Sequence, residues 1–455
     1  RADFVDAWVN KGAALDELKR YDEALAAYGQ AIRLQPACAK AWANRGLTLH
    51  ELKRYEEALA DYERALSIQP DNSVAWTNKG FTLGELKRYD EALSAHGRAI
   101  DIRPDNARAW TNRGFTLSEL KRYDEAVAAY ECALGIRPDD AEANHNLAQL
   151  CLALMQFDKG WEKYEWRWLI KNFNSPRPAT PKPLWDGGRS GERVLVWDEQ
   201  GIGDQILYGS LLGDLREFPQ KKIISVDPRL IPLFSRVFPE YEYPDGLPEA
   251  DKLDYDFQIP MGSLGRYFRN SLQDFTKGQY PYLKADEALA ASIRQQIRKE
   301  NRLLCGLSWN SRNKNVGNDK SLSLLNLLPI LSLENCQFVD LQYGDTGTER
   351  CLLEEKFGIP IHKVDGIDNY SNIDGLASII QACDLVVTVS NTTAHLAGAL
   401  GRKTLLLLPF SRGRFWYWHH INGRSLWYPS VSVFEQPAPG DWAAPIAQIA
   451  AILKK

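Results

Sequence analysis

The first third of the chain repeats one pattern of apolar and small positions every 34 residues. In each copy a Trp is followed four residues later by Gly, then by a Tyr with an Ala three residues after it, and finally by a Pro. The copies start at Trp8, Trp42, Trp76 and Trp110 and end at Pro36, Pro70, Pro104 and Pro138. Residues four apart share one face of a helix, and Pro ends a helix because it has no N–H to donate. The pattern predicts a two-helix hairpin in each copy.

A fifth, divergent copy continues the same phase. Phe157, Gly160 and Tyr164 occupy the expected positions, whereas Asn172 stands where Pro is expected. The second helix of this copy, over residues 158–170, is unusually aromatic, as a terminal repeat with a different outer face would be. Residues 1–171 therefore resemble a tetratricopeptide-repeat (TPR) superhelix of four regular units and a divergent fifth.

One polar position is constant within the regular copies, two residues after the Trp. It is occupied by Asn10, Asn44, Asn78 and Asn112. In a tetratricopeptide superhelix this position faces the concave groove, where an Asn side chain can both donate to and accept from an extended peptide backbone. The alternative is that these Asn side chains bond to the end of a neighbouring helix. The sequence leaves both interpretations open.

The 34-residue period stops at a Pro- and Gly-rich segment, residues 172–191, which we interpret as a linker. Beyond it, short apolar runs alternate with helical patterns, and the candidate strands are residues 194–197, 223–226, 303–309, 338–341, 385–389 and 404–408. Helical patterns include residues 285–299 and 372–382. This alternation predicts an α/β fold of two Rossmann-like halves, residues 192–299 and 300–455 with a C-terminal helix, whose ligands lie at the carboxyl ends of the strands.

Composition narrows the class of protein without indicating a partner. The formal net charge of −4 over 455 residues gives no electrostatic reason to expect nucleic acid, and no apolar stretch is long enough to span a bilayer. Seven scattered cysteines without metal-ligand spacing favour reduced thiols and a cytoplasmic protein. The chain opens with neither Met nor a signal-peptide pattern, so we expect an excerpt of a longer protein or a processed form, and further repeats before residue 1 stay open.

Two turns between a strand and a helix carry candidate chemistry. In residues 194–215, Gly201 and Gly203 permit a tight turn and Asp204 sits at a helix start, where it acts either as a general base or as an N-cap. In residues 384–410, Asn391, Thr392 and Thr393 precede a helix that contains His395. Hydroxyls and free amides at a helix N-terminus form an anion site, although a lone His often only caps or packs.

A third segment, residues 305–324, ends a strand in polar and basic side chains. Ser308 is one of the polar residues, and the basic Lys314 and Lys320 would neutralise a leaving phosphate there, or the segment is a solvated loop. Asp254 and Asp256 have the Asp-x-Asp spacing of metal-dependent transferases. They precede an apolar run and lie apart from the motif loops, so we interpret them as a strand end.

Four motifs together resemble those of GT-B glycosyltransferases related to bacterial heptosyltransferases. They are the GIGD turn, the SW…KSLSL segment, the HLAGALG helix and FWYW at residues 415–418. The fusion to repeats resembles the layout of O-linked N-acetylglucosamine transferases and, more closely, of bacterial repeat-bearing transferases that modify flagellin. The resemblance implies that Asp204 is the catalytic base and that the donor is held by Ser308, Lys320 or its rival Lys314, Gln342, Asn391, Thr392, Thr393 and His395. Family members have Asp-Thr where this chain has Ser390-Asn391, so a heptose donor is not implied.

The resemblance implies inverting, metal-independent transfer from a nucleotide sugar, with no cofactor. Asp204 would take the proton of the acceptor hydroxyl, while Lys320, Ser308 and the helix start at residues 393–395 would stabilise the leaving phosphate. The Asn-lined groove favours a protein acceptor modified on Ser or Thr. Two alternatives stay open: a glycan or lipid-linked acceptor with the repeats used for docking, and a non-catalytic scaffold. The sugar, the nucleotide and the oligomeric state are not indicated.

Overall fold

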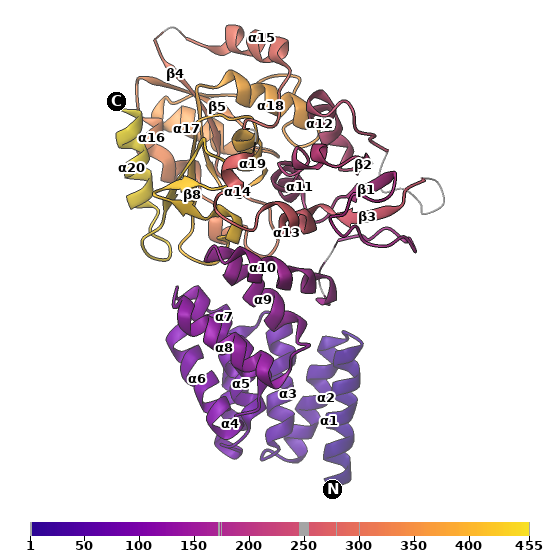
Figure 1. Ribbon diagram of the computed structural model, residues 1–455. Coiled ribbons are helices and arrows are strands. Elements are labelled where there is room, and N and C mark those ends of the chain that lie inside the picture. Colours follow the sequence, from indigo (N-terminus) through magenta and orange to yellow (C-terminus); the bar gives the residue numbers. More distant parts are fainter. Residues whose placement is uncertain are drawn as a thin grey trace. The chain divides into compact units, whose positions relative to one another are not determined.

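The chain folds into two compact domains, which Figure 1 shows as ribbons. The computed structural model describes residues 2–171, 173, 175–244, 254–278, 280–299 and 301–454. The first domain comprises Arg1–Leu150 with Trp166–Ile170 and is called here the repeat domain. The second comprises Cys151–Glu165 with Lys171–Lys455 and is called the α/β domain.

The repeat domain consists of consecutive antiparallel helix pairs, as the 34-residue period predicts (Figure 1). The helices are α1 Ala2–Glu17, α2 Tyr21–Leu34, α3 Ala39–Glu51, α4 Tyr55–Ile68, α5 Ser73–Glu85, α6 Tyr89–Ile102, α7 Ala107–Glu119, α8 Tyr123–Ile136 and α9 Ala141–Ala153. The prediction of an all-helical tetratricopeptide superhelix is confirmed.

The repeated Gly and Trp have distinct packing roles in the hairpins. A Cβ atom at Gly46 would lie 2.9 Å from the Tyr62 ring, so only glycine lets the second helix approach the first this closely. The Trp76 Nε1 atom donates to the carbonyl of Pro70 at 2.9 Å, which ties each hairpin to the loop before it. Equivalent Trp–Pro hydrogen bonds occur at Trp42 and Trp110.

The divergent fifth copy is divided between the domains. Its second helix, α10 (Phe157–Tyr164), belongs to the α/β domain and is followed by a 3₁₀ turn over Glu165–Leu169, so the helix is shorter than the aromatic run 158–170 suggested. Asn172, where Pro was expected, lies outside the described residues. Part of the predicted linker is packed rather than free, because buried Trp185 donates its backbone N–H to the carbonyl of Gln258 at 2.9 Å.

The α/β domain is built on two sheets. The first is parallel with the order β2-β1-β3, from β1 Arg193–Trp197, β2 Lys221–Ser225 and β3 Phe257–Pro260. The second has the order β6-β5-β4-β7-β8-β11-β10-β9, from β4 Leu303–Ser308, β5 Cys336–Asp340, β6 Ile361–His362, β7 Leu385–Val389, β8 Thr404–Leu408, β9 His420–Ile421, β10 Arg424–Ser425 and β11 Val431–Glu435. Its strands are parallel except at β9 and β10.

Helices cover these sheets, as alternating strand and helix patterns predict. They are α11 Ile202–Gly209, α12 Ile231–Val237, α13 Gly265–Phe268, α14 Asp274–Lys277, α15 Glu287–Ile297, α16 Leu328–Leu331, α17 Gly347–Phe357, α18 Ile373–Ala382, α19 Thr392–Ala399 and α20 Ala443–Leu453. The core of the second half packs the central strands against α20, with Leu307, Val387, Leu405 and Ile449 fully buried. The expected α/β class and C-terminal helix are thus present.

Strand order places a ligand site at one point of the second sheet. The chain moves outward from β4 to β5 and β6, and then returns to add β7 and β8 on the other side of β4. In open parallel sheets a crevice forms where the order reverses, beyond the carboxyl ends of the strands. The segments that follow β4 and β7 carry the predicted donor-binding residues, so the topology brings them together.

Candidate functional site

A pocket of about 200 Å³ lies at the carboxyl ends of the strands, between the two halves of the α/β domain. Its walls come from the turn after β1, the loop after β4, and the segments after β5, β7 and β8. Helices α11 and α19 pack against each other beside it (Figure 1). The lining includes Asp204, Lys320, Asn391, Thr392 and His395, so five of the nine site residues predicted in the α/β domain meet in one cavity.

Asp204 is brought to the pocket by the short helix α11. It is the third residue of the helix, and its Oδ2 atom accepts the N–H of Gly201 at 3.3 Å, so the helix cap is Gly201 and Asp204 bonds back to it. Burial raises the pKa of Asp204 to about 6, while the Gly201 amide and the charge of Lys320 oppose the rise. A carboxyl with such a pKa can take and release a proton near neutral pH.

Lys320 supplies the positive charge of the pocket. It ends a 3₁₀ turn over Asn318–Lys320, is only 4% exposed, and its Nζ lies 4.6 Å from the centre of the Phe415 ring. Burial lowers the pKa of Lys320 to about 8, and the negative charge of Asp204 counteracts this. A buried ammonium with no salt bridge among the described residues is available to an anionic ligand.

The start of α19 presents unsatisfied donors. Asn391 caps this helix through its Oδ1 atom, which accepts the Ala394 N–H, and the amides of Thr392 and Thr393 donate to none of the described residues. The Thr393 hydroxyl is fully buried and has no partner in the part of the chain that the structure describes. Free amides at a helix N-terminus favour an anion such as a phosphate group.

His395 is both packed and directed at the pocket. Its ring lies 4.6 Å from Trp418 and its Nδ1 is hydrogen bonded to the Tyr428 hydroxyl at 3.0 Å. Burial, assisted by the charge of Lys320, lowers the pKa of His395 to about 3, so the imidazole is neutral at pH 7. Its Nε2 bonds to no described residue and lies toward Gly203, where an added Cβ would come 3.0 Å from the His395 ring. One neutral ring nitrogen is therefore left for a ligand.

Three of the predicted donor contacts bond to one another. The Ser308 hydroxyl donates to Gln342 Oε1 at 3.1 Å and accepts from Asn391 Nδ2 at 2.8 Å. Gln342 Oε1 also accepts the backbone N–H groups of Trp309 and Asn310, at 2.9 and 2.8 Å. This network joins the segments after β4, β5 and β7. Ser308 and Gln342 are buried and do not line the pocket, so in this structure they hold its walls in register.

Lys314 and Lys320, the rivals for one role, are placed differently. Lys314 is exposed and lies away from the pocket lining, whereas Lys320 is buried within it. Other lining residues were not singled out from the sequence: Ser311, Asn313, Tyr343, Ser390, Phe415 and Tyr417. The aromatic run at residues 415–418 was the available signal for the last two, but a run of four aromatic residues does not show which of them faces a ligand.

The four repeat-domain asparagines differ in their surroundings. Asn10 is exposed, Asn44 and Asn112 are half-buried, and Asn78 is buried. No hydrogen bond of the Asn44 side chain to the end of a neighbouring helix is seen among the described residues. Asn78 Oδ1 and Asn112 Nδ2 are buried without partners among the described residues.

The Asp-x-Asp segment lies at the opposite edge of the first sheet. Asp256 precedes β3, and its carboxylate accepts the N–H groups of Glu192 and Arg193 at the start of β1. These hydrogen bonds lower the pKa of Asp256. Asp204 follows the other end of β1, so Asp256 terminates a strand and takes no part in the pocket. Within the described ranges, no group of three or more His, Cys, Asp and Glu side chains is arranged to hold a metal ion.

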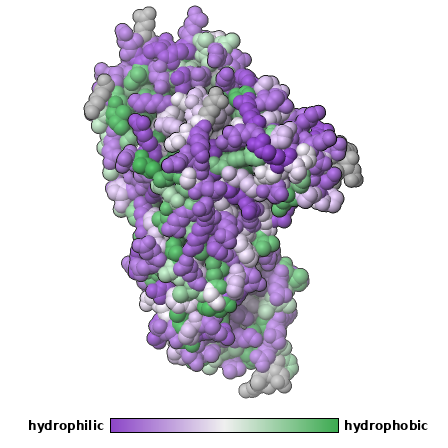
Figure 2. Space-filling model, in the orientation of Figure 1, coloured by the Kyte–Doolittle hydropathy of each residue, from purple (hydrophilic) through white to green (hydrophobic). Residues whose placement is uncertain are grey.

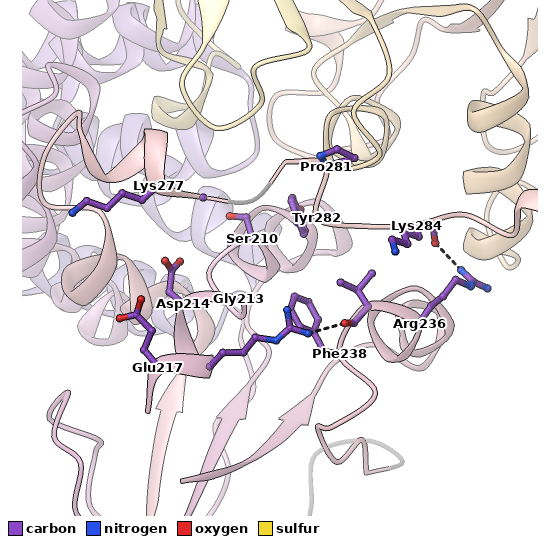
Figure 3. Close-up of a pocket in the computed structure, with 13 residues that line it drawn as sticks. Ser210, Gly213, Asp214, Glu217, Arg236, Phe238, Lys277, Pro281, Tyr282 and Lys284 are labelled. Atoms are coloured by element: carbon purple, nitrogen blue, oxygen red, sulfur yellow. Dashed lines mark hydrogen bonds between the residues drawn. The ribbon is translucent and has the colours of Figure 1, made fainter. Parts of the chain in front are cut away.

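A larger cavity of about 350 Å³ lies in the first half (Figure 3). Three of its basic lining residues are paired with neighbouring carboxylates: Arg216 with Glu240, Arg236 with Asp374, and Lys277 with Asp274. Figure 3 shows Asp214 and Glu217 side by side at one end of it. Asp214 also pairs with buried Arg269, at 3.0 Å. Because three of its four basic side chains are already paired with carboxylates, this cavity offers less to an anionic substrate than the Asp204 pocket.

The face shown in Figure 2 carries mostly hydrophilic side chains, with apolar ones scattered among them. A search of the described residues found no helix that combines the length and the apolar character needed to cross a membrane.

Comparison with known proteins identifies the repeats. The tetratricopeptide-repeat family matches residues 5–38, 39–72 and 71–139. Protein FlbA of Caulobacter vibrioides is 30% identical over 316 residues, which is 65% of this chain and 52% of that protein. The match thus spans about half the length of this curated relative.

Several solved structures are similar to part of this chain. YrrB, described as a TPR protein with an unusual peptide-binding site, is 23% identical and covers 35% of this chain and 82% of its own, with a TM-score of 0.30. PilF of Pseudomonas aeruginosa is 19% identical and covers 48% of this chain and 86% of its own, with a TM-score of 0.37. The chain contains tetratricopeptide repeats over residues 5–139 and carries a further, α/β domain.

Proposed function

We propose that the α/β domain is an inverting, metal-independent GT-B glycosyltransferase that moves a sugar from a nucleotide sugar to Ser or Thr hydroxyls of a protein held by the repeats. One observation carries this proposal. Groups from both halves of the α/β domain face the same pocket. The first half contributes the Asp204 carboxylate, and the second half contributes the Lys320 ammonium and the N-terminus of α19. A proton acceptor opposite an anion site is the arrangement that a single displacement at a sugar carbon requires.

The proposed step forms one bond and breaks another at the anomeric carbon. The acceptor oxygen attacks this carbon as its proton passes to Asp204, and the bond to the leaving phosphate oxygen breaks with its electron pair staying on the nucleotide. The negative charge that develops there is stabilised by Lys320 and by the amides of Thr392 and Thr393. A single displacement from the opposite side inverts the anomeric centre.

His395 supplies a neutral polar contact in this proposal. Because the pKa of His395 is lowered to about 3 by burial, its imidazole contributes a hydrogen bond and not a charge. The Thr393 hydroxyl is buried without a partner among the described residues beside the same helix start, although Thr393 does not line the pocket. Buried polar groups without partners are costly, and a bound phosphate or sugar would satisfy them.

The acceptor class is inferred from the repeats. Matches to the tetratricopeptide family support a protein-interaction role for residues 5–139. The exposed Asn10 side chain offers both a donor and an acceptor, which suits the N–H and C=O groups of an extended peptide backbone. A glycan or lipid-linked acceptor would not use these groups in the same way.

The proposal is tested by weighing an acceptor protein after incubation with the full chain and a panel of nucleotide sugars. We expect a mass increase of one sugar or more with the parent. Asp204→Asn should lower the rate by about 10²–10⁴-fold, the usual contribution of a general base. Asp256→Asn is the matched control, because it makes the same chemical change at the opposite edge of the sheet and should leave the rate unchanged.

Two outcomes would overturn the proposal. No mass increase with any donor would favour a non-catalytic scaffold, and equal rates for Asp204→Asn and the parent would remove Asp204 from the chemistry. Transfer to an oligosaccharide but not to protein or peptide would replace the acceptor class and leave the donor site intact.

A further inference from the structure

Helix α10 contacts two segments that line the pocket. One is the turn that carries Asp204, and the other is the segment that carries Phe415 and Tyr417. The Tyr164 hydroxyl lies 2.8 Å from the Tyr208 hydroxyl on α11 and accepts a hydrogen bond from Gln200 Nε2 at 3.2 Å. Gln200 directly precedes the turn that delivers Asp204. On its other side, the Tyr164 ring lies 6.1 Å from the Trp416 ring, edge to face. Trp416 stands between Phe415 and Tyr417, which both line the pocket.

A second aromatic side chain fixes α10 in place. Trp161 is 1% exposed, its Nε1 donates to the carbonyl of Arg269 at 2.8 Å, and its ring packs edge to face against Trp416 at 5.4 Å. A Cβ atom at Gly265 would lie 2.3 Å from the Trp161 ring, so α13 approaches α10 as closely as glycine allows. Such packing leaves the helix little freedom to shift.

We infer that α10, although it continues the repeat period, is a positioning element of the pocket, and that Tyr164 and Trp161 hold the Asp204 turn and the segment 415–418 in register. The inference rests on the proposed function for its kinetic consequences. Asp204 belongs to the first half of the α/β domain and Phe415 and Tyr417 to the second, and α10 is bonded or packed to both. A reacting constellation needs its side chains held within about 0.5 Å, which requires such a bridge between separately folded segments.

The alternative is that α10 only contributes buried area and stability. Tyr164→Phe separates the two roles, because it keeps the ring and removes the hydroxyl that joins Tyr208 and Gln200. Its matched control is Tyr241→Phe, which removes a buried hydroxyl bonded to the Leu212 carbonyl at 2.9 Å, at a residue 6% exposed. Tyr241 does not line the pocket. A second variant, Trp161→Phe, removes the hydrogen bond to Arg269 and reduces the packing contact with Trp416, because the Phe ring is smaller.

The first measurement is hydrogen exchange of the full-length variants, followed by peptide mass spectrometry. We expect faster exchange in residues 200–204 and 415–418 for Tyr164→Phe and Trp161→Phe, and no change there for Tyr241→Phe. The second is steady-state transfer. The loss of a single hydrogen bond predicts a fall in kcat of about 3- to 10-fold for Tyr164→Phe with a donor KM within about twofold of the parent.

The inference is overturned if exchange in both segments matches the parent in both variants. It is also overturned if Tyr241→Phe, at an equal loss of Tm, lowers kcat as much as Tyr164→Phe does, since α10 would then act through stability alone. These results differ from a failure of the proposed function, which is the absence of sugar transfer by the parent. The exchange measurement needs no activity and decides the inference in either case.

Discussion

At the scale of single residues, Asp204 and Lys320 define the pH range in which the pocket can work. Burial raises the pKa of Asp204 to about 6 and lowers that of Lys320 to about 8. For transfer, the Asp204 carboxyl must be ionised so that it can act as the proposed base. Lys320 must be protonated so that its ammonium can bind the phosphate. Activity should therefore rise with pH as the Asp204 carboxyl loses its proton and fall as the Lys320 ammonium loses its own. Because the two groups interact, the pKa values of the two limbs describe the Asp204–Lys320 pair as a whole and not either residue alone.

The measurement is the pH dependence of kcat/KM, which we predict to be bell-shaped with limbs near pH 6 and pH 8. Lys320→Arg keeps the positive charge to a much higher pH, so it should move the alkaline limb upward while the acid limb stays in place. An alkaline limb that does not move would show that Lys320 is not the group titrating there.

His96 departs from the pattern of its repeat. It stands where Tyr28, Tyr62 and Tyr130 stand in the other regular copies, and both of its ring nitrogens are buried without partners among the described residues. Asn112 stands where Asn44 and Asn78 stand in the preceding copies, and its Nδ2 is buried without a described partner. We predict that His96→Tyr, which restores the phenol ring of the other copies and removes two partnerless ring nitrogens, stabilises the repeat domain by about 0.5–1.5 kcal/mol.

The same substitution has a pH signature. Burial lowers the pKa of His96 to about 3 from 6.5, so the folded state resists protonation that the unfolded chain accepts. Above pH 6.5 His96 is neutral in both states and does not affect the free energy of unfolding. As pH falls from 6.5 toward 3, only the unfolded chain binds a proton at His96, so the free energy of unfolding decreases. The gain in Tm of His96→Tyr over the parent, followed by helical circular dichroism, should be larger at pH 5 than at pH 7.5. An equal gain at both pH values would contradict this account.

At the scale of elements, glycines on the repeat helices divide into two kinds. A Cβ at Gly46 in α3 would meet the Tyr62 ring at 2.9 Å, whereas a Cβ at Gly97 in α6 would meet nothing within 4 Å. Gly46→Ala should destabilise the repeat domain by about 1–3 kcal/mol through overpacking. Gly97→Ala should stabilise it by about 0.5–1 kcal/mol, since Ala favours a helix interior. Urea unfolding of the two variants measures both signs, and two changes of equal sign would contradict the packing argument.

The Gln342 network holds the loop that carries Lys320. Gln342→Ala leaves the buried amide of Trp309 and the amide of Asn310 without their acceptor, which should cost about 2–4 kcal/mol. The loosened loop should weaken nucleotide binding by about 3- to 10-fold. Gln337→Ala is the control, because buried Gln337 accepts the Lys299 N–H at 2.9 Å at the opposite edge of the same sheet. It should lower Tm while leaving nucleotide affinity unchanged. Equal affinity losses would contradict this role of Gln342.

At the scale of the whole molecule, long periodic segments could be predicted and short ones could not. The 34-residue period gave the repeat hairpins, and apolar runs gave β1, β2, β4, β5, β7 and β8 within a few residues. The strands β6, β9 and β10 have two residues each, too few for any alternation to show. The division of the fifth copy between the domains depends on tertiary contacts of Trp161 and Tyr164, which no local pattern records.

The site was partly predictable for a related reason. Topology brings the ends of parallel strands together, so Asp204, Lys320 and His395 could be expected near one another. Which side chains face the ligand depends on local turns. Ser308 bonds to Gln342 and Asn391 instead of entering the pocket, and the 3₁₀ turn at residues 318–320 selects Lys320 over Lys314. Sequence spacing does not specify these orientations.

The most direct test of the donor site is calorimetric titration of the full chain with nucleoside mono- and diphosphates. The account predicts that at least one nucleotide binds the parent, that Asp204→Asn retains this binding, and that Lys320→Met weakens it by about tenfold or more, the loss of one charge-assisted contact to phosphate. Binding that is unchanged in Lys320→Met, or a parent that binds none of the nucleotides, would contradict the claim that this pocket receives a nucleotide sugar.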